Sequence, residues 1–276
     1  MNILFFTIGD STLLHMQSLY SIRTVYVHSN SDDKIYILTD SPALYLNLPF
    51  VKVIEITSEE ISEWKGSYGY FFRIKINAIR KFAQSHNSEH LMFLDSDTYC
   101  IKNLNNIKDL LQKGYGVMHK DEGSMEIMKG DSAKMWSQTC GKTYANIKIG
   151  KQHRMWNSGV VAIPKEMAVP VMNKALDICD AMLADGVTCF NMEQWGISIA
   201  LGEFSRNIKE ASSFIGHYWH HKYVWTRFIS CFFTESYAHG RSLEDELYII
   251  RKTDHRKLAR KLYIKRTFLK ILFLKH

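Results

Sequence analysis

Residues 93–99 read Phe93-Leu94-Asp95-Ser96-Asp97-Thr98-Tyr99 and join the end of an apolar run to a pair of acids. The run itself, Leu91–Leu94, predicts a short strand that is buried on both faces of a sheet. Ligands of open α/β sheets gather just beyond the carboxyl ends of such strands. Two carboxylates placed there repel one another and lose hydration unless a cation joins them. A hard divalent ion that holds a diphosphate suits these oxygen ligands, whereas the alternative is an ordinary turn with two solvated acids.

Strand and helix signals alternate along the chain on both sides of this stretch. Short apolar runs predict strands at residues 2–7, 34–39, 51–56, 91–94 and 160–163. Helical patterns begin at residue 11 or 12, span 70–84 and 167–183, and start again near 191. Repeated β-α-β units predict an α/β fold with a mostly parallel central sheet and helices on both faces. The segment 114–154 has weak periodicity, and we expect it to leave the sheet and help build a substrate site.

The net charge of +7 is concentrated at one end of the 276 residues. Residues 251–276 contain ten Lys and Arg side chains and one acid, so this tail carries +9 and residues 1–250 carry −2. The body therefore lacks the basic excess that nucleic-acid binding requires. The apolar fraction of 46% is that of a packed globular protein. We expect one domain over residues 1–250, followed by a basic helical tail over 251–276.

The tail ends in an apolar run, Phe268–Leu274, which is too short to cross a bilayer. Together with the basic residues before it, this run predicts an interfacial anchor on anionic lipid. The alternative is a basic helix that packs its apolar face on the body. The five cysteines are scattered without a Cys-x-x-Cys pair, and the amino terminus lacks the basic region of a secretory signal, which favours the cytoplasm.

A lysine occupies an unexpected position in the helix predicted at 70–84. At 100° per residue, Lys75 projects from the centre of the apolar face that contains Ile79 and Phe82. An unpaired ammonium is costly to bury, so Lys75 must either extend to solvent or meet an anion. Because the helix directly precedes the acidic strand end, that anion is expected to be Asp95, Asp97 or a bound phosphate.

Two further segments place amide and acid side chains near strand or helix ends. Asn157 lies in an Asn-Ser-Gly turn before the predicted strand at 160–163, where its donor and acceptor suit sugar hydroxyls. Asn191, Glu193 and Gln194 open a helix, and the alternative for them is a capping box of Asn191 with Gln194. In that interpretation Glu193 favours the positive helix end. The same placement would suit an acid that accepts hydrogen bonds from a sugar.

A cluster of histidines and aromatic residues follows at 216–225. His217 and His221 have the spacing of metal ligands on one helix, whereas His217 alone could complete a site begun by two acids. Lys222 could neutralise a phosphate, and the aromatic rings could stack on a sugar or a base.

Together these segments resemble a metal-dependent glycosyltransferase that uses nucleotide sugars and has a single Rossmann-like domain, the A-type fold. The family that they resemble is family 8, which contains galactosyl- and glucosyltransferases of bacterial lipopolysaccharide and the glycogenin-like enzymes. Four landmarks follow that family's order over residues 1–230: Leu-Asp-Ser-Asp-Thr, Asn-Ser-Gly, an acid-Gln pair and a late His-to-Trp segment. The late segment departs from the family pattern H-x-x-G-x-x-K-P-W, because His220 replaces the glycine, Lys222 stands one place early and no proline precedes Trp225.

The resemblance implies a role for each of these positions. Asp95, Asp97 and His217 would bind Mn²⁺ or Mg²⁺, and Lys222 would contact the diphosphate of a UDP-sugar. The other residues expected to bind the donor are Thr7 and Asp40 near the nucleotide base, and Lys75 and Ser96. The expected catalytic residues, which would face the donor sugar, are Asn157, Glu193 and Gln194.

The activity that the resemblance implies is transfer of a hexose or an N-acetylhexosamine from a UDP-sugar to a saccharide or lipid-linked saccharide acceptor. Its setting would be synthesis of a bacterial cell-surface polysaccharide (lipopolysaccharide, O-antigen or capsule) at the cytoplasmic face of the inner membrane. We expect retention of anomeric configuration, with Glu193 as general base if the reaction inverts. The acceptor hydroxyl is expected to approach from the side of Trp156 and Trp195.

Two other classes of protein remain as alternatives. A phosphatase of the haloacid-dehalogenase type also places Asp-x-Asp with Mg²⁺ at a strand end. That family favours Thr or Val where Tyr99 stands, and it uses a later acidic pair that is not evident in this sequence. The other alternative is a catalytically silent sugar-binding scaffold.

Overall fold

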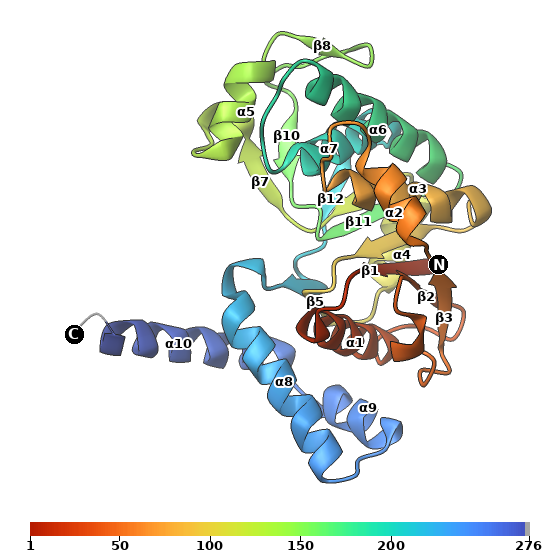
Figure 1. The fold of residues 1–276 in the computed structure, drawn as a ribbon, viewed down its shortest axis with the longest axis vertical. Coiled ribbons are helices and arrows are strands. Elements are labelled where there is room, and N and C mark those ends of the chain that lie inside the picture. Colours follow the sequence, from red (N-terminus) through yellow and green to blue (C-terminus); the bar gives the residue numbers. More distant parts are fainter. Residues whose placement is uncertain (274–276) are drawn as a thin grey trace.

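The computed structural model describes residues 1–273, with side chains for residues 1–264. Its central sheet contains β1 (Asn2–Thr7), β2 (Lys34–Thr39), β3 (Val51–Glu55), β4 (Leu91–Leu94), β6 (Gly116–Met118), β11 (Val160–Ile163) and β12 (Ile208–Glu210). Shorter strands pair outside it: β5 (Thr98–Cys100) with β13 (Ile215–His217), β7 (Asp121–Ser124) with β10 (Arg154–Trp156), and β8 (Thr143–Tyr144) with β9 (Ile147–Lys148). Figure 1 shows helices on both sides of the central sheet.

The described helices follow the strands in the alternation that the sequence predicts. They are α1 (Thr12–Tyr26), α2 (Ser58–Lys65), α3 (Arg73–Ser85), α4 (Asn105–Gln112), α5 (Asp131–Thr139), α6 (Ala168–Ala184), α7 (Met192–Phe204), α8 (Lys222–Ala238), α9 (Leu243–Lys252) and α10 (His255–Phe273). Single 3-10 turns occur at η1 (Pro42–Leu44), η2 (Met125–Ile127) and η3 (Trp219–His221). The α/β prediction is therefore confirmed.

The central sheet is mostly parallel, in the order β12-β6-β11-β4-β1-β2-β3, and only β11 runs against its described neighbours. The reversal of β11 has a direct consequence for the site. Val160 at the start of β11 pairs with Leu94 at the end of β4. The Asn157 turn, which precedes β11, therefore lies at the same sheet edge as the acids that follow β4. The backbone confirms this meeting, because Asp95 N donates to Gly159 O over 3.0 Å.

Apolar residues on the two faces of the sheet form two separate cores. Leu4 and Phe93 pack with α3, α6 and α7 on one face, whereas Ile3 and Met92 pack with α1 and α4 on the other. All four residues of β4 are buried. Burial on both faces explains why Leu91–Leu94 is a continuous apolar run rather than an alternating one.

The pair formed by β5 and β13 brings a distant segment to the acidic turn. His217 lies opposite Thr98 in this antiparallel ladder, and Tyr218 N donates to Asp97 O over 3.1 Å. The neighbouring Gly216 allows the close approach, because a Cβ at that position would lie 2.1 Å from Cζ of Tyr99. This short ladder thus brings His217 next to Asp97, which lies 120 positions earlier in the sequence.

The last three helices form a unit on the side of the sheet that carries α1 (Figure 1). A third apolar cluster, which includes Tyr20, Tyr99 and Trp225, holds this unit against α1 and β5. The expected boundary at 250/251 lies within α9. Helix α10 extends away from the body (Figure 1), and its beginning packs on the body through His255, which hydrogen-bonds Tyr20 over 3.0 Å.

The packing alternative for the tail is thus confirmed for the beginning of α10, where Ala259 is also buried. The apolar run Phe268–Leu274 lies outside the described side chains. Within the described part of the chain, no helix combines the length and the apolar character needed to cross a bilayer.

Candidate active site

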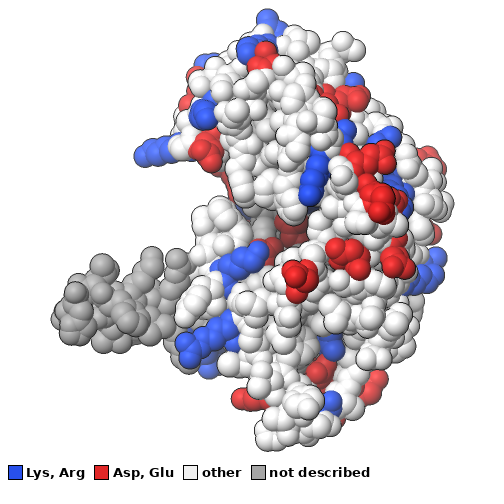
Figure 2. All heavy atoms as spheres, viewed as in Figure 1, with Lys and Arg blue, Asp and Glu red and all other residues white. Residues whose placement is uncertain are grey.

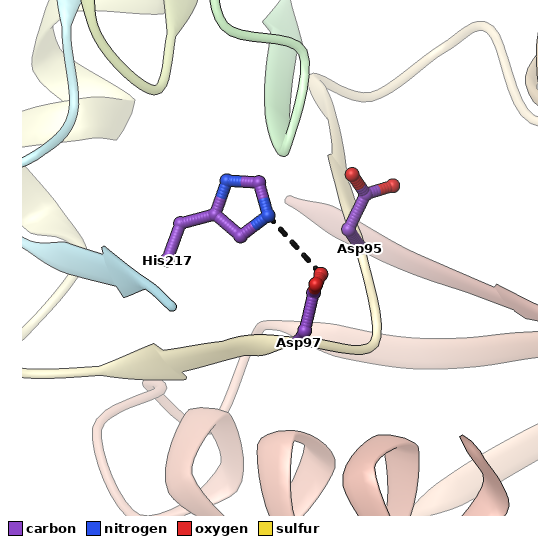
Figure 3. A group of neighbouring side chains, drawn as sticks. All are labelled: Asp95, Asp97 and His217. Atoms are coloured by element: carbon purple, nitrogen blue, oxygen red, sulfur yellow. Dashed lines mark hydrogen bonds and ion pairs between the residues drawn. The ribbon is translucent and has the colours of Figure 1, made fainter. Parts of the chain in front are cut away.

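Three side chains from two segments form a candidate metal centre at the carboxyl edge of the sheet. Asp95, Asp97 and His217 each offer a ligand atom, and these atoms lie within 4.8 Å of one another. Figure 3 shows the imidazole of His217 directed at the carboxylate of Asp97, with Nε2 to Oδ1 at 3.1 Å. Two carboxylates and one imidazole are a donor set that suits Mn²⁺ or Mg²⁺. The residues present therefore fit the cation that the sequence led us to expect.

Asp97 stays ionised although it is almost fully buried. Burial alone would raise the pKa of its carboxyl group. The hydrogen bond and charge of His217, and the ammonium of Lys222 at 3.3 Å from Oδ2, outweigh burial and hold this pKa well below its ordinary value. The side chain of Lys222 is 51% exposed, so it can also reach a ligand outside the protein surface.

The interpretation of His217 and His221 as a helical ligand pair is wrong. His217 ends strand β13, whereas His221 lies in η3, so the two are not on one helix. The ring of His221 instead stacks on Tyr263, with ring centroids 3.8 Å apart. The structure agrees with the other interpretation as far as position goes, because His217 lies with the two acids. Its role as a metal ligand stays a prediction.

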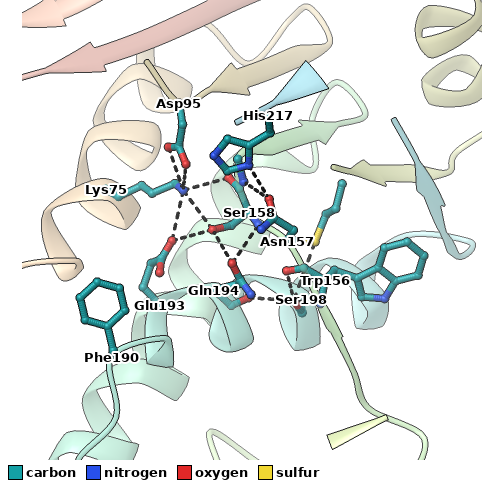
Figure 4. Close-up of polar contacts among 12 residues, drawn as sticks. Lys75, Asp95, Trp156, Asn157, Ser158, Phe190, Glu193, Gln194, Ser198 and His217 are labelled. Atoms are coloured by element: carbon teal, nitrogen blue, oxygen red, sulfur yellow. Dashed lines mark hydrogen bonds and ion pairs between the residues drawn. The ribbon is translucent and has the colours of Figure 1, made fainter. Parts of the chain in front are cut away.

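Lys75 lies at the centre of a second, buried part of the site (Figure 4). Its ammonium is 3.0 Å from Oδ1 of Asp95 and 3.2 Å from Oε1 of Glu193. It also donates to the backbone O and to Oγ of Ser158, over 2.8 and 3.0 Å. Burial would lower the pKa of Lys75, but the two carboxylates raise it, so the lysine stays charged. Of the two possibilities for this lysine, contact with an anion is confirmed and extension to solvent is wrong, and Asp95 is one of its two carboxylate partners.

The amide side chains of Asn157 and Gln194 are held by the protein rather than left open. Gln194 does not form the expected capping box, because no side chain caps α7. Its Oε1 accepts from Ser158 N over 3.2 Å, and its Nε2 donates to Glu122 over 2.9 Å. Asn157 also donates to Glu122, over 3.0 Å. Glu122 was not predicted from the sequence. It lies in the segment 114–154, whose weak periodicity does not distinguish one residue from its neighbours.

The structure brings most of the sequence-predicted residues to one edge of the sheet but does not join all of them in one network. Thr7 ends β1 and is buried. Asp40 follows β2, and its carboxylate accepts from Gly9 N over 2.8 and 3.1 Å. Ser96 is buried between the two acids. Within the described residues, no hydrogen bond of these three side chains reaches Asp97, His217 or Lys75. Their expected contacts with the donor therefore stay predictions.

An aromatic hollow of about 500 Å³ adjoins the buried part of the site. Its lining includes Tyr68, Tyr70, Phe71, Phe72 and Phe190. The hydroxyl of Tyr70 links it to Glu193, because it donates to the backbone O of Phe190 over 2.7 Å and accepts from Glu193 N over 3.3 Å. A second hollow, of about 520 Å³ beside Tyr26, contains none of the site residues.

The expected approach of an acceptor along Trp156 and Trp195 needs correction. Trp195 is fully buried and packs near Trp136, with ring centroids 6.3 Å apart, so it cannot face an acceptor. Figure 2 shows a hollow in the face of the molecule between the part that contains α5 to α7 and the part that contains α1 and α8. Acidic side chains lie deep in this hollow.

Comparison with solved structures shows that the fold is the A-type fold of glycosyltransferases. One similar solved structure is an active-site mutant of LgtC, with a TM-score of 0.50, 14% identity, and coverage of 76% of this chain and 72% of that chain. Another is the galactosyltransferase LgtC in complex with donor and acceptor sugar analogues, with a TM-score of 0.50, 12% identity, and coverage of 76% and 73%. No protein-family model and no curated protein matches the sequence. The resemblance expected from the sequence is thus confirmed for the fold.

We predict that Lys75→Met lowers the free energy of unfolding by about 3–5 kcal/mol, because it leaves Asp95 and Glu193 without their shared cation. Urea unfolding of the metal-free protein measures this loss. The matched control is Lys81→Met on the same helix, where the ion pair with Glu60 is about one-third exposed and the loss should stay below about 1 kcal/mol. Equal losses for the two variants would contradict a buried ion-pair network at Lys75.

Proposed function

We propose that this protein is a metal-dependent glycosyltransferase that moves a hexose or N-acetylhexosamine from a UDP-sugar to a saccharide acceptor. The observation that carries the proposal is the group of Asp95, Asp97 and His217 with Lys222 beside it. This arrangement combines ligands for a divalent cation with a partly exposed ammonium, and these are the two kinds of group that a diphosphate needs. Its place at the carboxyl edge of an A-type fold supports the same proposal.

The proposed chemistry assigns different tasks to the two lysines. A bound divalent cation would supply Lewis-acid stabilisation of the charge that develops on the departing nucleoside diphosphate. Lys222 adds a second positive charge from the exposed side of the site, where its ammonium can stay close to the departing diphosphate. The donor hydrogens of Lys75 are directed at Asp95, Ser158 and Glu193. Lys75 therefore positions a metal ligand, and Lys222 is the residue that contacts the leaving group.

The position of Glu193 supports retention of anomeric configuration. A general base for an inverting reaction must reach the acceptor hydroxyl. The Glu193 side chain is only 6% exposed, and its Oε1 lies 3.2 Å from the Lys75 ammonium and accepts from Ser158 Oγ over 2.8 Å. A carboxylate held by these two partners is not free to reach an acceptor hydroxyl, so we assign Glu193 a positioning role in a retaining enzyme.

The aromatic hollow is the proposed entry for the saccharide acceptor. Aromatic rings stack on the apolar faces of sugars and leave the sugar hydroxyls free for polar contacts. Phe190 and Phe71 are 63% and 54% exposed, so their rings are available for such stacking. Because Tyr70 connects this hollow to Glu193, a sugar bound there would lie next to the polar part of the site.

The biological setting that we propose is synthesis of a bacterial cell-surface polysaccharide at the cytoplasmic face of the inner membrane. The family 8 resemblance of the sequence and the basic tail support this setting. The first part of α10 exposes Arg256, Lys257, Arg260 and Lys261, while its buried side packs on the body. These exposed cations would face anionic lipid if the remainder of the tail lies in the interface.

We predict that Asp97→Asn abolishes Mn²⁺-dependent hydrolysis and transfer of UDP-sugars and leaves the fold intact. The variant removes a charged ligand, so Mn²⁺ affinity measured by calorimetry should fall at least about 100-fold, beyond the range seen for residues outside the ligand set. Asp109→Asn, at an exposed position of α4, is the control and should behave as wild type. Normal turnover by the Asp97 variant would exclude the metal role, and phosphatase activity without nucleotide-sugar hydrolysis would favour the alternative enzyme class.

We predict that Phe190→Ala raises the KM for the acceptor about three- to tenfold, because one stacking surface is lost. Hydrolysis of the UDP-sugar in the absence of acceptor should not change. Tyr237→Ala removes an aromatic ring that is 90% exposed on α8 and should alter neither quantity. An unchanged acceptor KM for the Phe190 variant would place the acceptor elsewhere.

We predict that truncation after Ile264 weakens binding to vesicles that contain phosphatidylserine by at least about tenfold, because basic residues near such a surface contribute about 1 kcal/mol each. This cut retains the packed beginning of α10, including His255 and Ala259. Vesicles of phosphatidylcholine alone are the control for charge. Equal co-sedimentation of full-length and truncated protein with the anionic vesicles would support packing as the tail's main role.

A further inference from the structure

The first turn of α7 contains backbone N–H groups that the helix itself cannot satisfy. Its first internal hydrogen bond runs from Trp195 N to Asn191 O over 3.1 Å. The N–H groups of Met192, Glu193 and Gln194 come before this bond and, as at the start of any α-helix, have no acceptor within the helix. Met192 and Glu193 are buried, and a buried N–H group without an acceptor is costly.

The residue at the N-cap position of α7 does not supply an acceptor. Asn191 makes no capping hydrogen bond with its side chain, and its backbone has φ −101° and ψ 23°. A capping residue usually has an extended backbone instead. Ser242 before α9 shows this usual geometry, with φ −73° and ψ 167°, and its side chain accepts from Asp245 N. The start of α7 therefore depends on an acceptor from another segment.

The hydroxyl of Tyr70, in the segment before α3, is that acceptor. Glu193 N donates to its oxygen over 3.3 Å, and the hydroxyl hydrogen is donated to the backbone O of Phe190 over 2.7 Å. A phenol hydroxyl has one hydrogen and two lone pairs, so it can form both bonds at once. Burial and the nearby Glu193 carboxylate raise the pKa of Tyr70, so the hydroxyl keeps its hydrogen.

The position of Tyr70 is fixed by contacts of its own segment. Arg73 N donates to the backbone O of Tyr70 over 3.1 Å. The guanidinium of Arg73 forms two hydrogen bonds with Asp180 of α6, over 2.7 and 2.9 Å. The ring of Phe72 packs on both Tyr70 and Phe190, with ring centroids 5.9 and 4.4 Å apart. The hydroxyl is thus held in place in the protein without a ligand.

The chain around the start of α3 contacts Glu193 at two points. Tyr70 accepts from its backbone N, and the ammonium of Lys75 lies 3.2 Å from its Oε1 (Figure 4). Gln194 is the next residue, and its Oε1 accepts from Ser158 N over 3.2 Å. A shift of the first turn of α7 would therefore move both side chains that the family resemblance places at the donor sugar.

We propose that Tyr70 is a positioning residue whose hydroxyl replaces the missing cap of α7 and thereby places Glu193 and Gln194, while its ring lines the aromatic hollow. The hydroxyl then serves the reaction at the donor, and the ring serves binding of the acceptor. This inference rests on the proposed function for the reaction that the two residues serve. The effect of the hydroxyl on the backbone of α7 can be measured without metal or substrate.

The test uses Tyr70→Phe in the full-length protein, because this variant removes the hydroxyl and keeps the ring. Amide hydrogen exchange of the metal-free protein, followed by NMR, should become at least about tenfold faster at Glu193, where the N–H group loses its acceptor. Amides in the middle of α7 should exchange as in the wild type.

Kinetics with Mn²⁺ and a UDP-sugar then test the role of the hydroxyl in the reaction. For Tyr70→Phe, kcat should fall about tenfold for transfer and for hydrolysis without acceptor, because a small displacement of positioned groups is enough for such a loss. The KM for the acceptor should not change, since the ring remains. Phe190→Ala should give the opposite pattern, with a raised acceptor KM and unchanged hydrolysis.

Tyr115→Phe is the matched control for removal of a tyrosine hydroxyl. The ring of Tyr115 is half-buried and lies under the cations of Arg206 and Lys209, with Arg206 Cζ 5.2 Å and Lys209 Nζ 4.9 Å from its centroid. In the part of the chain that the structure describes, its hydroxyl forms no hydrogen bond. It precedes β6 at the opposite edge of the sheet from the candidate site. Exchange at Glu193, kcat and KM should all stay at their wild-type values.

The outcomes distinguish this inference from the proposed function. Unchanged exchange at Glu193 in Tyr70→Phe would overturn the inference, and so would faster exchange along the whole of α7, which would indicate a general loss of stability. Faster exchange at Glu193 with an unchanged kcat would also overturn it, because the hydroxyl would then serve folding alone. If exchange responds as expected but the wild type neither hydrolyses nor transfers any nucleotide sugar, the replacement of the cap stands and the proposed function fails.

Discussion

The buried ammonium of Lys75 is the point at which the segments of the site meet. It is surrounded by Asp95 after β4, Ser158 before β11 and Glu193 in α7, so one side chain from α3 contacts three other segments. An ammonium can be buried only where acceptors and negative charge surround it. This constraint fixes the carboxylate of Asp95 in place and leaves the neighbouring Asp97 to interact with His217 and Lys222.

Backbone topology and side-chain chemistry make separate contributions to the candidate metal centre. The reversed strand β11 brings the Asn157 turn to the carboxyl edge of the sheet, and the ladder of β5 and β13 brings His217 to the same place. Buried polar groups then set the orientation of each side chain. The fold therefore determines where each residue lies, whereas the chemistry depends on the side chains that are placed there.

Strands buried on both faces, such as Leu91–Leu94, were predicted because they form continuous apolar runs. The short strands β6 and β12 were not predicted, and β6 shows that the segment 114–154, which we expected to leave the sheet, begins with one of its strands. The sequence also indicated that Lys75 either extends to solvent or meets an anion, because an unpaired buried ammonium is costly, and the structure shows the second. The sequence could not predict that Gln194 turns away from its helix terminus toward Ser158, because that choice depends on tertiary contacts. Glu122 was missed for the same reason. The pairing of His217 with Asp97 was only one of two open interpretations, because three-residue strands carry almost no periodic signal.

The central claim is that Asp95, Asp97 and His217 hold a divalent cation that binds a nucleotide sugar. The most direct measurement is a thermal-shift panel of UDP-, GDP- and CMP-sugars, each with and without Mn²⁺, on the full-length protein. The account predicts that a UDP-sugar raises the melting temperature only when Mn²⁺ is present, since linked binding stabilises the folded state. Equal stabilisation with and without Mn²⁺, or no stabilisation by any nucleotide sugar, would contradict it.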